Sequence, residues 1–313
     1  PVLNGESWLI GPNPTDLGEL QGEIHPGKPF EGQEPVDHHI WQDAKGEWRC
    51  WSCVRHTAVG RIFYGWKASD LEKSPWEATG VMMRRDQSYG ESLADRADRI
   101  HSRSEWLQSP FVIRENGRFY MFYGGECYDP LGRILLSTMC LATSEDGITF
   151  SRHVNRLGMS WVFMGPGEAR DPSLIKVGDT WLCYYSGNET GWPEPNKVYV
   201  RTSGDLLNWS ASREVHWGGS PGRLGYQCEC PTVAYRAGYY YLLRTKNYWE
   251  GLTYVYRSED PFDFGLDTDR CLIGQLDVAA PEFVVDGRKE YLSSNKDLMG
   301  GVRLHRLKWV NSE

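Results

Sequence analysis

The chain has 313 residues, of which 40% are hydrophobic and 24% are charged, a composition typical of a folded globular protein. Its formal net charge is −8, and no run of Lys or Arg is longer than a pair. These features argue against nucleic acid or an anionic membrane as the main partner. No apolar stretch approaches the roughly 20 residues of a membrane span, so no membrane insertion is expected.

The earliest close pair of cysteines along the chain, Cys50 and Cys53, has a spacing that also occurs in metal and redox sites. Both lie in a strand-like run, where residues three positions apart point to opposite faces. We therefore predict buried, apolar thiols at these positions rather than a zinc or redox site.

A repeated pattern runs along the chain five times. Each copy has an extended run, a turn that contains Gly, and an aromatic-rich run, which together indicate a β-hairpin. The turn glycines are Gly46, Gly117, Gly178, Gly238 and Gly287. In the first four copies a Ser- and Asp-containing turn follows, as at 143–147 and 202–206, and predicts a second hairpin. Five four-stranded antiparallel units in series predict an all-β, five-bladed β-propeller.

The repeats predict a single domain, 1–313, with an N-terminal segment 1–35. The expected blades lie at about 36–80, 106–153, 168–215, 228–265 and 278–309. The fifth copy lacks the second hairpin, and an open ring would leave an exposed sheet edge. Residues 7–10 are therefore predicted to supply the closing strand of the last blade. A short helix is expected only within 91–106.

In a propeller the first strand of each blade lines the central axis, and its first residues surround one mouth of the channel. The equivalent positions here are Asp37, Ser109, Asp171, Cys230 and Ala280. One residue earlier lie Val36, Gln108, Arg170, Glu229 and Ala279. Carboxylates occur at these positions only in blades one, three and four, so they are not part of the structural repeat. This selective placement predicts a functional site formed by Asp37, Asp171 and Glu229.

Three carboxyl groups at one mouth suit the cleavage of a glycosidic bond. That reaction needs one carboxylic acid to protonate the leaving oxygen and one carboxylate on the other side of the sugar. Blades one and four are not adjacent in a ring of five, so Asp37 and Glu229 are expected to face each other. Asp171 lies on the blade next to Glu229, and its charge should raise the pKa of Glu229 and keep it protonated as a general acid.

The Arg-Asp-Pro run at 170–172 and the Glu-Cys-Pro run at 229–231 resemble motifs of two glycoside hydrolase families. These are the five-bladed families 32 and 43, the invertase/inulinase and arabinanase/β-xylosidase groups. The resemblance spans about 36–309 and implies a catalytic set of a first-blade Asp, a third-blade Asp and a fourth-blade Glu. The first blade departs from both families, because Asp37 is followed by two His residues and no Asp-Pro is present.

Other residues near the same mouth are candidates for sugar contacts. Arg170 can donate in a fork to a carboxylate or a sugar hydroxyl. The remaining candidates are His38, Trp106, Gln108, Ser109 and Glu282, of which Glu282 is also the expected substitute for Asp37. No cofactor and no catalytic metal are expected. The candidate ligand for a structural cation in the central channel is His305.

The leading hypothesis is an exo-acting, inverting glycoside hydrolase that removes a pentose or furanoside residue from an oligosaccharide or polysaccharide of plant or algal origin. This would be an arabinofuranosidase- or xylosidase-like enzyme. The alternative within enzymes is a retaining, fructofuranosidase-like hydrolase. A propeller that binds carbohydrate or protein without catalysis is the alternative from another class. The chain starts at Pro1 without a Met, and a periplasmic or extracellular location is favoured over a cytoplasmic one.

Overall fold

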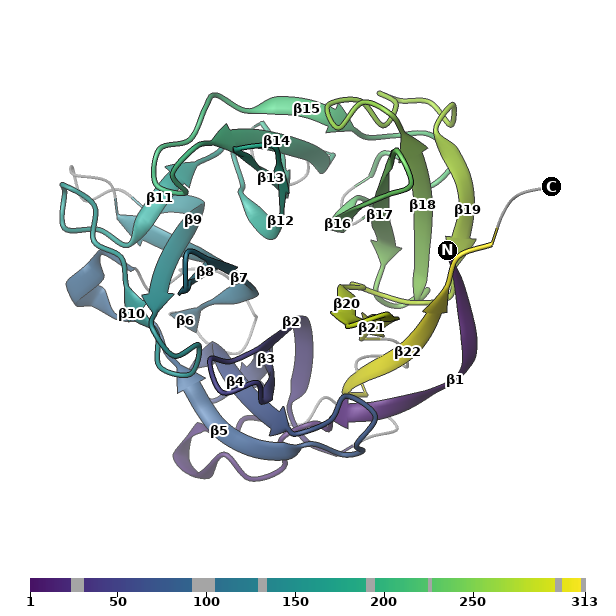
Figure 1. The fold of residues 1–313 in the computed structure, drawn as a ribbon. Helices are drawn as coiled ribbons and strands as arrows, with labels where there is room; N and C mark the ends of the chain where they lie inside the picture. Colours follow the sequence, from purple (N-terminus) through teal and green to yellow (C-terminus); the bar gives the residue numbers. More distant parts are fainter. Residues whose placement is uncertain are drawn as a thin grey trace.

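Five antiparallel sheets surround a central axis in the computed structural model, which confirms the predicted all-β, five-bladed β-propeller (Figure 1). The structure describes residues 1–23, 31–91, 105–128, 134–189, 195–224, 227–295 and 300–310. Within these ranges the helices are two short 3-10 turns, Gly18–Leu20 and Gln87–Tyr89. None of the described helices is long and apolar enough to cross a membrane. The helix expected within 91–106 falls largely on 92–104, outside the described residues.

Each blade has four strands ordered from the axis outward. Blade 1 comprises β2 (Glu34–Gln42), β3 (Trp48–Thr57), β4 (Gly60–Ala68) and β5 (Glu77–Met83), with β6 (Glu105–Trp106) paired to β4. Blade 2 comprises β7 (Gln108–Glu115), β8 (Arg118–Tyr128), β9 (Ile134–Ser144) and β10 (Ser151–Arg152), with β11 (Trp161–Met164) paired to β9. Blade 3 comprises β12 (Arg170–Val177), β13 (Thr180–Gly187), β14 (Lys197–Ser203) and β15 (Arg213–His216). Blade 4 comprises β16 (Glu229–Arg236), β17 (Tyr239–Asn247), β18 (Leu252–Ser258) and β19 (Leu272–Leu276). Blade 5 comprises β20 (Phe283–Asp286), β21 (Lys289–Ser294), β22 (Val302–Lys308) and β1 (Val2–Gly11).

The Gly-containing turns join the first two strands of each blade, as the repeat predicts. In blade 2 the turn residues Asn116 and Gly117 have φ values of 50° and 83°, and in blade 4 Ala237 and Gly238 have 50° and 88°. Two successive residues with positive φ define the type I′ turn, whose twist matches that of the flanking strands. Glycine meets this requirement without the steric cost that a Cβ would bring.

The predicted Ser–Asp turns have the same geometry in blades 2 and 3. Ser144 Oγ and Ser203 Oγ each accept backbone N–H groups from the residues that follow them. Asp146 and Asp205 then accept two further backbone N–H groups each, which closes the turn. The turns therefore satisfy their own backbone donors and leave the sheet hydrogen bonds intact.

Blade 4 extends further along the chain than the sequence pattern indicates. Its outer strand β19 lies at Leu272–Leu276, beyond the predicted blade end at 265. The intervening segment is attached to blade 3 by two backbone hydrogen bonds, Phe264 N to Val215 O and Asp267 N to Trp217 O. The chain thus covers part of the neighbouring blade before it returns to blade 4.

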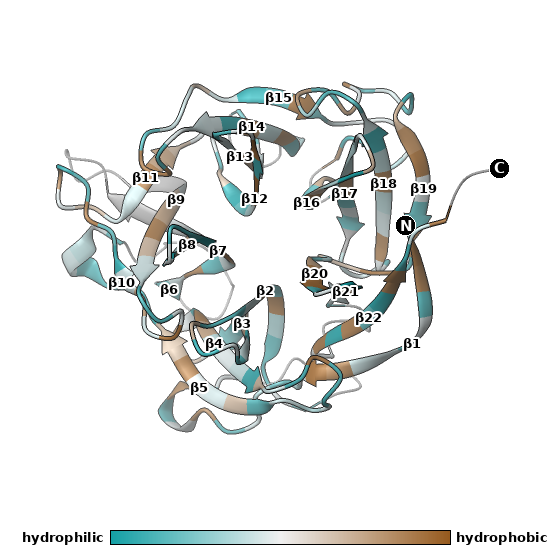
Figure 2. Cartoon of the chain, viewed as in Figure 1, coloured by the Kyte–Doolittle hydropathy of each residue, from teal (hydrophilic) through white to brown (hydrophobic). Residues whose placement is uncertain are grey.

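The core consists of five clusters, each between two neighbouring blades. Blades 5 and 1 share a cluster with Trp66 and Tyr291, whereas blades 4 and 5 share one with Leu243 and Leu292. The other three clusters fill the remaining blade interfaces. Figure 2 accordingly shows apolar residues interspersed with polar ones along the strands of the ring. Because each blade needs both neighbours to bury its two faces, closure of the ring matters for stability.

The two closely spaced cysteines support this arrangement. Cys50 is buried in the cluster between blades 5 and 1, and Cys53 is buried in the cluster between blades 1 and 2. They therefore point to opposite faces of β3, as predicted. No disulfide joins any two of the seven cysteines whose side chains are described.

The N-terminal strand β1 closes the ring by pairing with β22, and Figure 1 shows β1 beside β22 in the same blade. Trp8 pairs with Leu304 and Leu9 with Arg303, so residues 7–10 supply the predicted outer strand. The Trp8 indole N–H donates to Leu71 O at 2.9 Å in blade 1. Its ring meets Tyr291 edge-on, with a centroid separation of 6.0 Å.

Replacing Trp8 with Ala is therefore expected to lower the free energy of unfolding by about 2–3 kcal/mol, less than for a fully buried Trp because Trp8 is half-buried. Urea unfolding measures this loss. Trp249 is 57% exposed, and Trp249→Ala should stay within about 0.5 kcal/mol of the unsubstituted protein. Equal stabilities for the two variants would mean that the contacts of Trp8 on β1 do not contribute to the stability of the closed ring.

Candidate active site

The first strand of every blade begins with the same unusual backbone conformation. Positive φ values of 43° to 58° occur at Asp37, Ser109, Asp171, Cys230 and Ala280, the five positions that the repeat aligns. Few residues other than Gly adopt this conformation. In blades 1 to 4 the strand pairing also shifts register at this point, which is the mark of a β-bulge. A bulge redirects a side chain, and here it turns the rim residues toward the axis.

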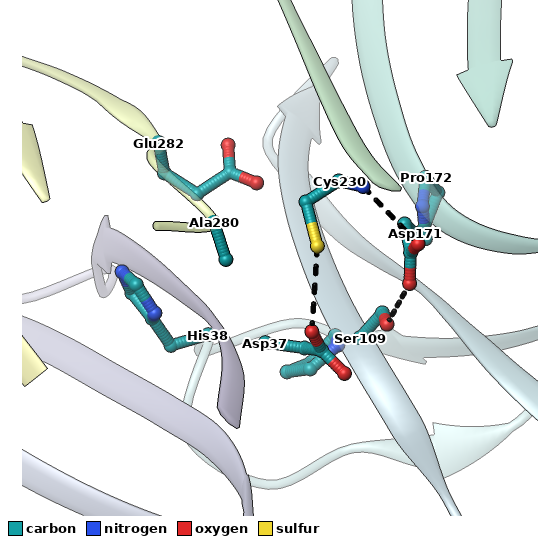
Figure 3. Close-up of a pocket in the computed structure, with 9 residues that line it drawn as sticks. Asp37, His38, Ser109, Asp171, Pro172, Cys230, Ala280 and Glu282 are labelled. Atoms are coloured by element: carbon teal, nitrogen blue, oxygen red, sulfur yellow. Dashed lines mark hydrogen bonds between the residues drawn. The ribbon is translucent and has the colours of Figure 1, made fainter. Parts of the chain in front are cut away.

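These five rim residues line one pocket at the mouth of the channel (Figure 3). The rest of its wall is formed by His38, Pro110, Pro172 and Glu282. Glu229 and Arg170 are not in this wall but adjoin it through Asp171. The predicted catalytic carboxyl groups of blades 1, 3 and 4 are therefore brought to one place, together with that of Glu282 from blade 5.

Arg170 joins two of the three predicted catalytic residues. Its Nη1 atom donates to Glu229 Oε1 at 2.8 Å and to Asp171 Oδ2 at 3.2 Å. Burial raises the pKa of Glu229 to about 7, with Asp171 adding to the increase and Arg170 opposing it. No donor among the described residues reaches Glu229 Oε2, so this oxygen is left for a substrate. Near neutral pH a large fraction of Glu229 holds a proton that it can donate.

Three donors fix the carboxyl group of Asp171. Ser109 Oγ donates to its Oδ1 at 2.6 Å, and the Cys230 backbone N–H donates to its Oδ2 at 3.2 Å. Arg170 supplies the third donor. Ser109 is thus occupied by Asp171 rather than free for a sugar. The carboxylate of Asp171 is held beside Glu229 and Asp37, and its charge raises the pKa of both.

Asp37 has a partner that the sequence pattern does not reveal. The Tyr248 hydroxyl donates to Asp37 Oδ1, and the Cys230 thiol lies 3.5 Å from the same oxygen. Burial is the main cause that raises the pKa of Asp37, followed by the charge of Asp171. Among the described residues, no donor reaches Oδ2 of Asp37. One oxygen is therefore anchored, and the other remains available.

The two histidines after Asp37 are neutral, and both ring nitrogens of His38 are hydrogen-bonded. His38 Nδ1 lies 2.8 Å from Asn295 Oδ1 and its Nε2 lies 2.6 Å from Ser293 Oγ, which ties blade 1 to blade 5. Burial lowers the pKa of His38 to about 4 and that of His39 to about 3. His38 lines the pocket, but its ring nitrogens are engaged in this clamp, so it is positioned to shape the wall rather than to bind a sugar hydroxyl.

Glu282 adds a fourth carboxyl group to the pocket. Its Oε2 accepts from Thr232 Oγ1 at 3.2 Å and lies 3.7 Å from His39 Nδ1. Burial raises the pKa of Glu282 well above its usual range, which favours its protonated, neutral form. Because His39 is also neutral, the contact between them is not an ion pair. A protonated Glu282 can donate a hydrogen bond to a sugar.

Trp106 and Gln108 lie beside Arg61 and not in the pocket wall. The Arg61 guanidinium stacks 3.7 Å from the Trp106 ring centroid and donates to Gln108 Oε1 at 3.0 Å. Both predicted sugar contacts therefore pack on Arg61 of blade 1, Trp106 from β6 and Gln108 from β7 of blade 2.

His305 does not reach the channel, and its predicted placement is wrong. It lies on β22, the third strand from the axis, with β20 and β21 between it and the channel. The sequence pattern assigned residues 301–309 too far inward because the hairpin β20–β21 already supplies the two inner strands of blade 5. His305 is therefore removed from the candidate ligands of a channel cation.

Arg244 holds the loop that leads into Glu229, another role that the sequence analysis missed. This fully buried side chain donates to the backbone carbonyls of Gly218, Gly222 and Gln227 at 2.5–2.8 Å. Its Nη1 also donates to His216 Nε2 at 2.9 Å. Arginine has no acceptor atoms, so His216 Nε2 accepts and Nδ1–H donates to Gly265 O.

Register counting could have located Tyr248. In the blade 4 hairpin the chain reverses at Gly238, and Thr245 on β17 pairs with Glu229 on β16. Residues shortly after Thr245 must therefore return to the rim that carries the acid. No comparable rule places Arg244, because its partners belong to a loop of irregular backbone.

Comparisons with known proteins agree with this fold. No family model matches the chain. A probable sucrose-6-phosphate hydrolase of Psychromonas ingrahamii is 25% identical over 234 residues, which cover 72% of this chain and 35% of that protein. The chain thus spans about a third of the length of this relative.

Solved structures of two glycoside hydrolase families share the propeller. The GH43_1 enzyme from Xanthomonas citri complexed with xylotriose superposes with a TM-score of 0.62 at 12% identity, covering 89% of this chain and 88% of that one. The GH32 β-fructofuranosidase of Bombyx mori superposes with a TM-score of 0.59 at 17% identity, covering 88% of this chain and 61% of that one. The resemblance to families 43 and 32 that the sequence motifs indicated is confirmed, and the likeness in structure is one of fold.

Proposed function

We propose that the chain hydrolyses a terminal glycosidic bond, with Glu229 as general acid and Asp37 as the opposing carboxylate. The observation that carries this proposal is that Asp37 and Asp171 line one pocket and that Arg170 joins Glu229 to Asp171 beside it. Glycoside hydrolysis uses two such groups in different protonation states. A pocket closed by the rims of all five blades favours binding of a chain end, and therefore exo-action.

Each group has a defined task in this reaction. Glu229 donates its proton to the leaving oxygen, and burial keeps that proton in place near neutral pH. Asp171 orients the pair and holds negative charge beside the sugar, which develops positive charge in the transition state. In the inverting reaction Asp37 takes a proton from the attacking water, and in the retaining reaction it attacks the anomeric carbon itself.

We favour a pentose or other furanoside residue as the sugar released and inversion as the outcome, with an oligosaccharide or polysaccharide as substrate. Inversion is favoured because the first blade lacks the longer Trp-Met-Asn-Asp-Pro-Asn motif of the invertase group. A periplasmic or extracellular location belongs to this proposal, since a polysaccharide is too large to enter a cell intact.

A retaining fructofuranosidase-like hydrolase is the second candidate. Two observations favour it: the similarity to the Psychromonas ingrahamii protein and the Glu-Cys-Pro run at 229–231. An Asp37 carboxylate anchored at Oδ1 with Oδ2 available also suits a nucleophile.

A panel of nitrophenyl pentosides, xylo- and arabino-oligosaccharides, sucrose and fructans tests the proposal. Release of a terminal pentose supports the first candidate, and release of fructose supports the second. Proton NMR of the first-formed sugar then gives its anomeric configuration: inversion assigns Asp37 as base and retention assigns it as nucleophile. Binding of a glycan without release of sugar would mean a non-catalytic propeller and would contradict the proposal.

The pH dependence of kcat/KM is expected to fall above about pH 7, because Glu229 loses its proton there. Arg170 lowers the pKa of Glu229, so Arg170→Met should raise that pKa and move the alkaline limb upward by about one pH unit, besides reducing kcat. Arg114→Met removes a cation that contacts Phe119 instead and should leave the limb in place. If the alkaline limb keeps its position in Arg170→Met, that limb does not report the ionisation of Glu229.

A further inference from the structure

We propose that Tyr248 is a positioning residue for Asp37: its hydroxyl fixes Oδ1 of the carboxylate and leaves Oδ2 directed to the substrate. This inference rests on the proposed function of Asp37. It adds to the site a residue that belongs to neither the Arg-Asp-Pro nor the Glu-Cys-Pro run.

The geometry connects two non-adjacent blades across the mouth. Tyr248 directly follows β17 of blade 4, whereas Asp37 lies on β2 of blade 1. The Tyr248 hydroxyl donates to Asp37 Oδ1, and Cys230 Sγ lies 2.9 Å from the same hydroxyl. Cys230 Sγ is also 3.5 Å from Asp37 Oδ1. One phenol and one thiol therefore meet a single carboxylate oxygen.

The direction of the hydrogen bond follows from chemistry. A carboxylate only accepts, so the phenol must donate to it. Burial, and then the charge of Asp37, raises the pKa of Tyr248 well above its usual range, so the hydroxyl keeps its proton at neutral pH. The thiol of Cys230 is held protonated in the same way, chiefly by burial. Both neighbours are therefore neutral donors throughout the pH range in which the site would work.

The bond has a consequence for the protonation of Asp37. Burial and the charge of Asp171 favour the neutral acid, whereas the Tyr248 hydroxyl favours the carboxylate. Arg61 and Arg170 also favour the carboxylate, at longer range. The other ionisable groups around the pocket are His38, Glu229, Cys230 and Glu282. Among these groups, Tyr248 is the one whose hydroxyl is hydrogen-bonded to Asp37. Removing that hydroxyl therefore isolates one contribution to the pKa of Asp37.

A hydroxyl deletion tests this role. Because a hydrogen bond to a charged group contributes the equivalent of about one to two pKa units, Tyr248→Phe should raise the pKa of Asp37 by about that amount. Titration of the Asp37 carboxyl by ¹³C NMR, with Asp37→Asn to assign its signal, measures the shift directly. Tyr248 is half-buried, so the variant should fold, and its melting temperature checks that it does.

Kinetics provide a second measurement. The acidic limb of kcat/KM should move to higher pH by the same amount, and kcat should fall while KM stays nearly constant, because Tyr248 acts through Asp37. Tyr241→Phe is the matched control: it removes a hydroxyl from β17, the strand that Tyr248 follows, where the ring packs on Trp309. That variant should titrate like the unsubstituted protein.

An Asp37 pKa in Tyr248→Phe equal to that of the unsubstituted protein would overturn the inference. The NMR titration does not depend on catalysis, so its result stands even if no glycoside in the panel is cleaved. In that case the proposed function would fail, whereas a shifted Asp37 pKa would still assign Tyr248 as its anchor. Conversely, a cleaved glycoside with an unshifted Asp37 pKa would reject the role of Tyr248 alone.

Discussion

Glu229→Gln is expected to reduce kcat by about 10²–10⁴-fold on a substrate with a poor leaving group, because an amide cannot donate a proton to the leaving oxygen. The amide keeps the size of the side chain and can still accept from Arg170, so the fold should be retained. On a nitrophenyl glycoside the loss should be much smaller, since nitrophenolate leaves without protonation. Steady-state kinetics on both substrate types measure the difference.

The same variant should also lose the alkaline limb of its pH profile. Glu290 serves as a control, since Glu290→Gln removes a carboxylate that pairs with Arg236 at the surface of blade 5 and should leave kcat unchanged. An equal loss on good and poor leaving groups would show that Glu229 does not act as the acid.

Asp37→Asn is expected to reduce kcat by at least about 10²-fold on both substrate types, because neither mechanism proceeds without this carboxylate. The amide oxygen can still accept from Tyr248, so the pocket should keep its shape. Unlike Glu229→Gln, this variant should gain nothing from a better leaving group. Measuring kcat for both variants on the same two substrates separates the role of base or nucleophile from the role of acid.

Asp179→Asn, at an exposed hairpin turn of blade 3, is the matched control for this substitution. The double variant with Asp37→Asn and Glu229→Gln should be hardly slower than the worse single variant, since residues that act as a unit are strongly non-additive. Activity retained in Asp37→Asn would transfer the role to another carboxyl group of the pocket, with Glu282 as the first candidate.

The rim of the site could be predicted from the sequence because the repeat aligns it. Asp37 lies nine residues before its turn glycine and Asp171 lies seven residues before its own, so counting back from the turns places both near the start of their first strands, and the closed ring brings these starts together. The five rim residues share a positive φ, so the positions that the sequence repeat pairs are also equivalent in backbone conformation. The closing strand at residues 7–10 was predictable for a related reason, because the last repeat lacks an outer strand.

What the repeat does not encode is the environment of each rim residue. Ser109 and Gln108 follow the repeat, but their partners, Asp171 and Arg61, lie on neighbouring blades, so the pattern gave their position and not their role. Tyr248 and Arg244 lie within the predicted fourth blade, but the repeat assigns neither of them a partner. His305 was misplaced because the hairpin β20–β21 already supplies the two inner strands of blade 5, which leaves β22 third from the axis.

A crystal structure of the Glu229→Gln variant with an intact substrate from the panel is the most direct test of the proposed chemistry. We expect the terminal sugar in the pocket of Figure 3, with the glycosidic oxygen within hydrogen-bond reach of the residue 229 amide and the anomeric carbon facing Asp37 Oδ2. A sugar bound with its glycosidic oxygen away from residue 229, or bound outside this pocket, would contradict the assignment of Glu229 and Asp37 as the catalytic pair.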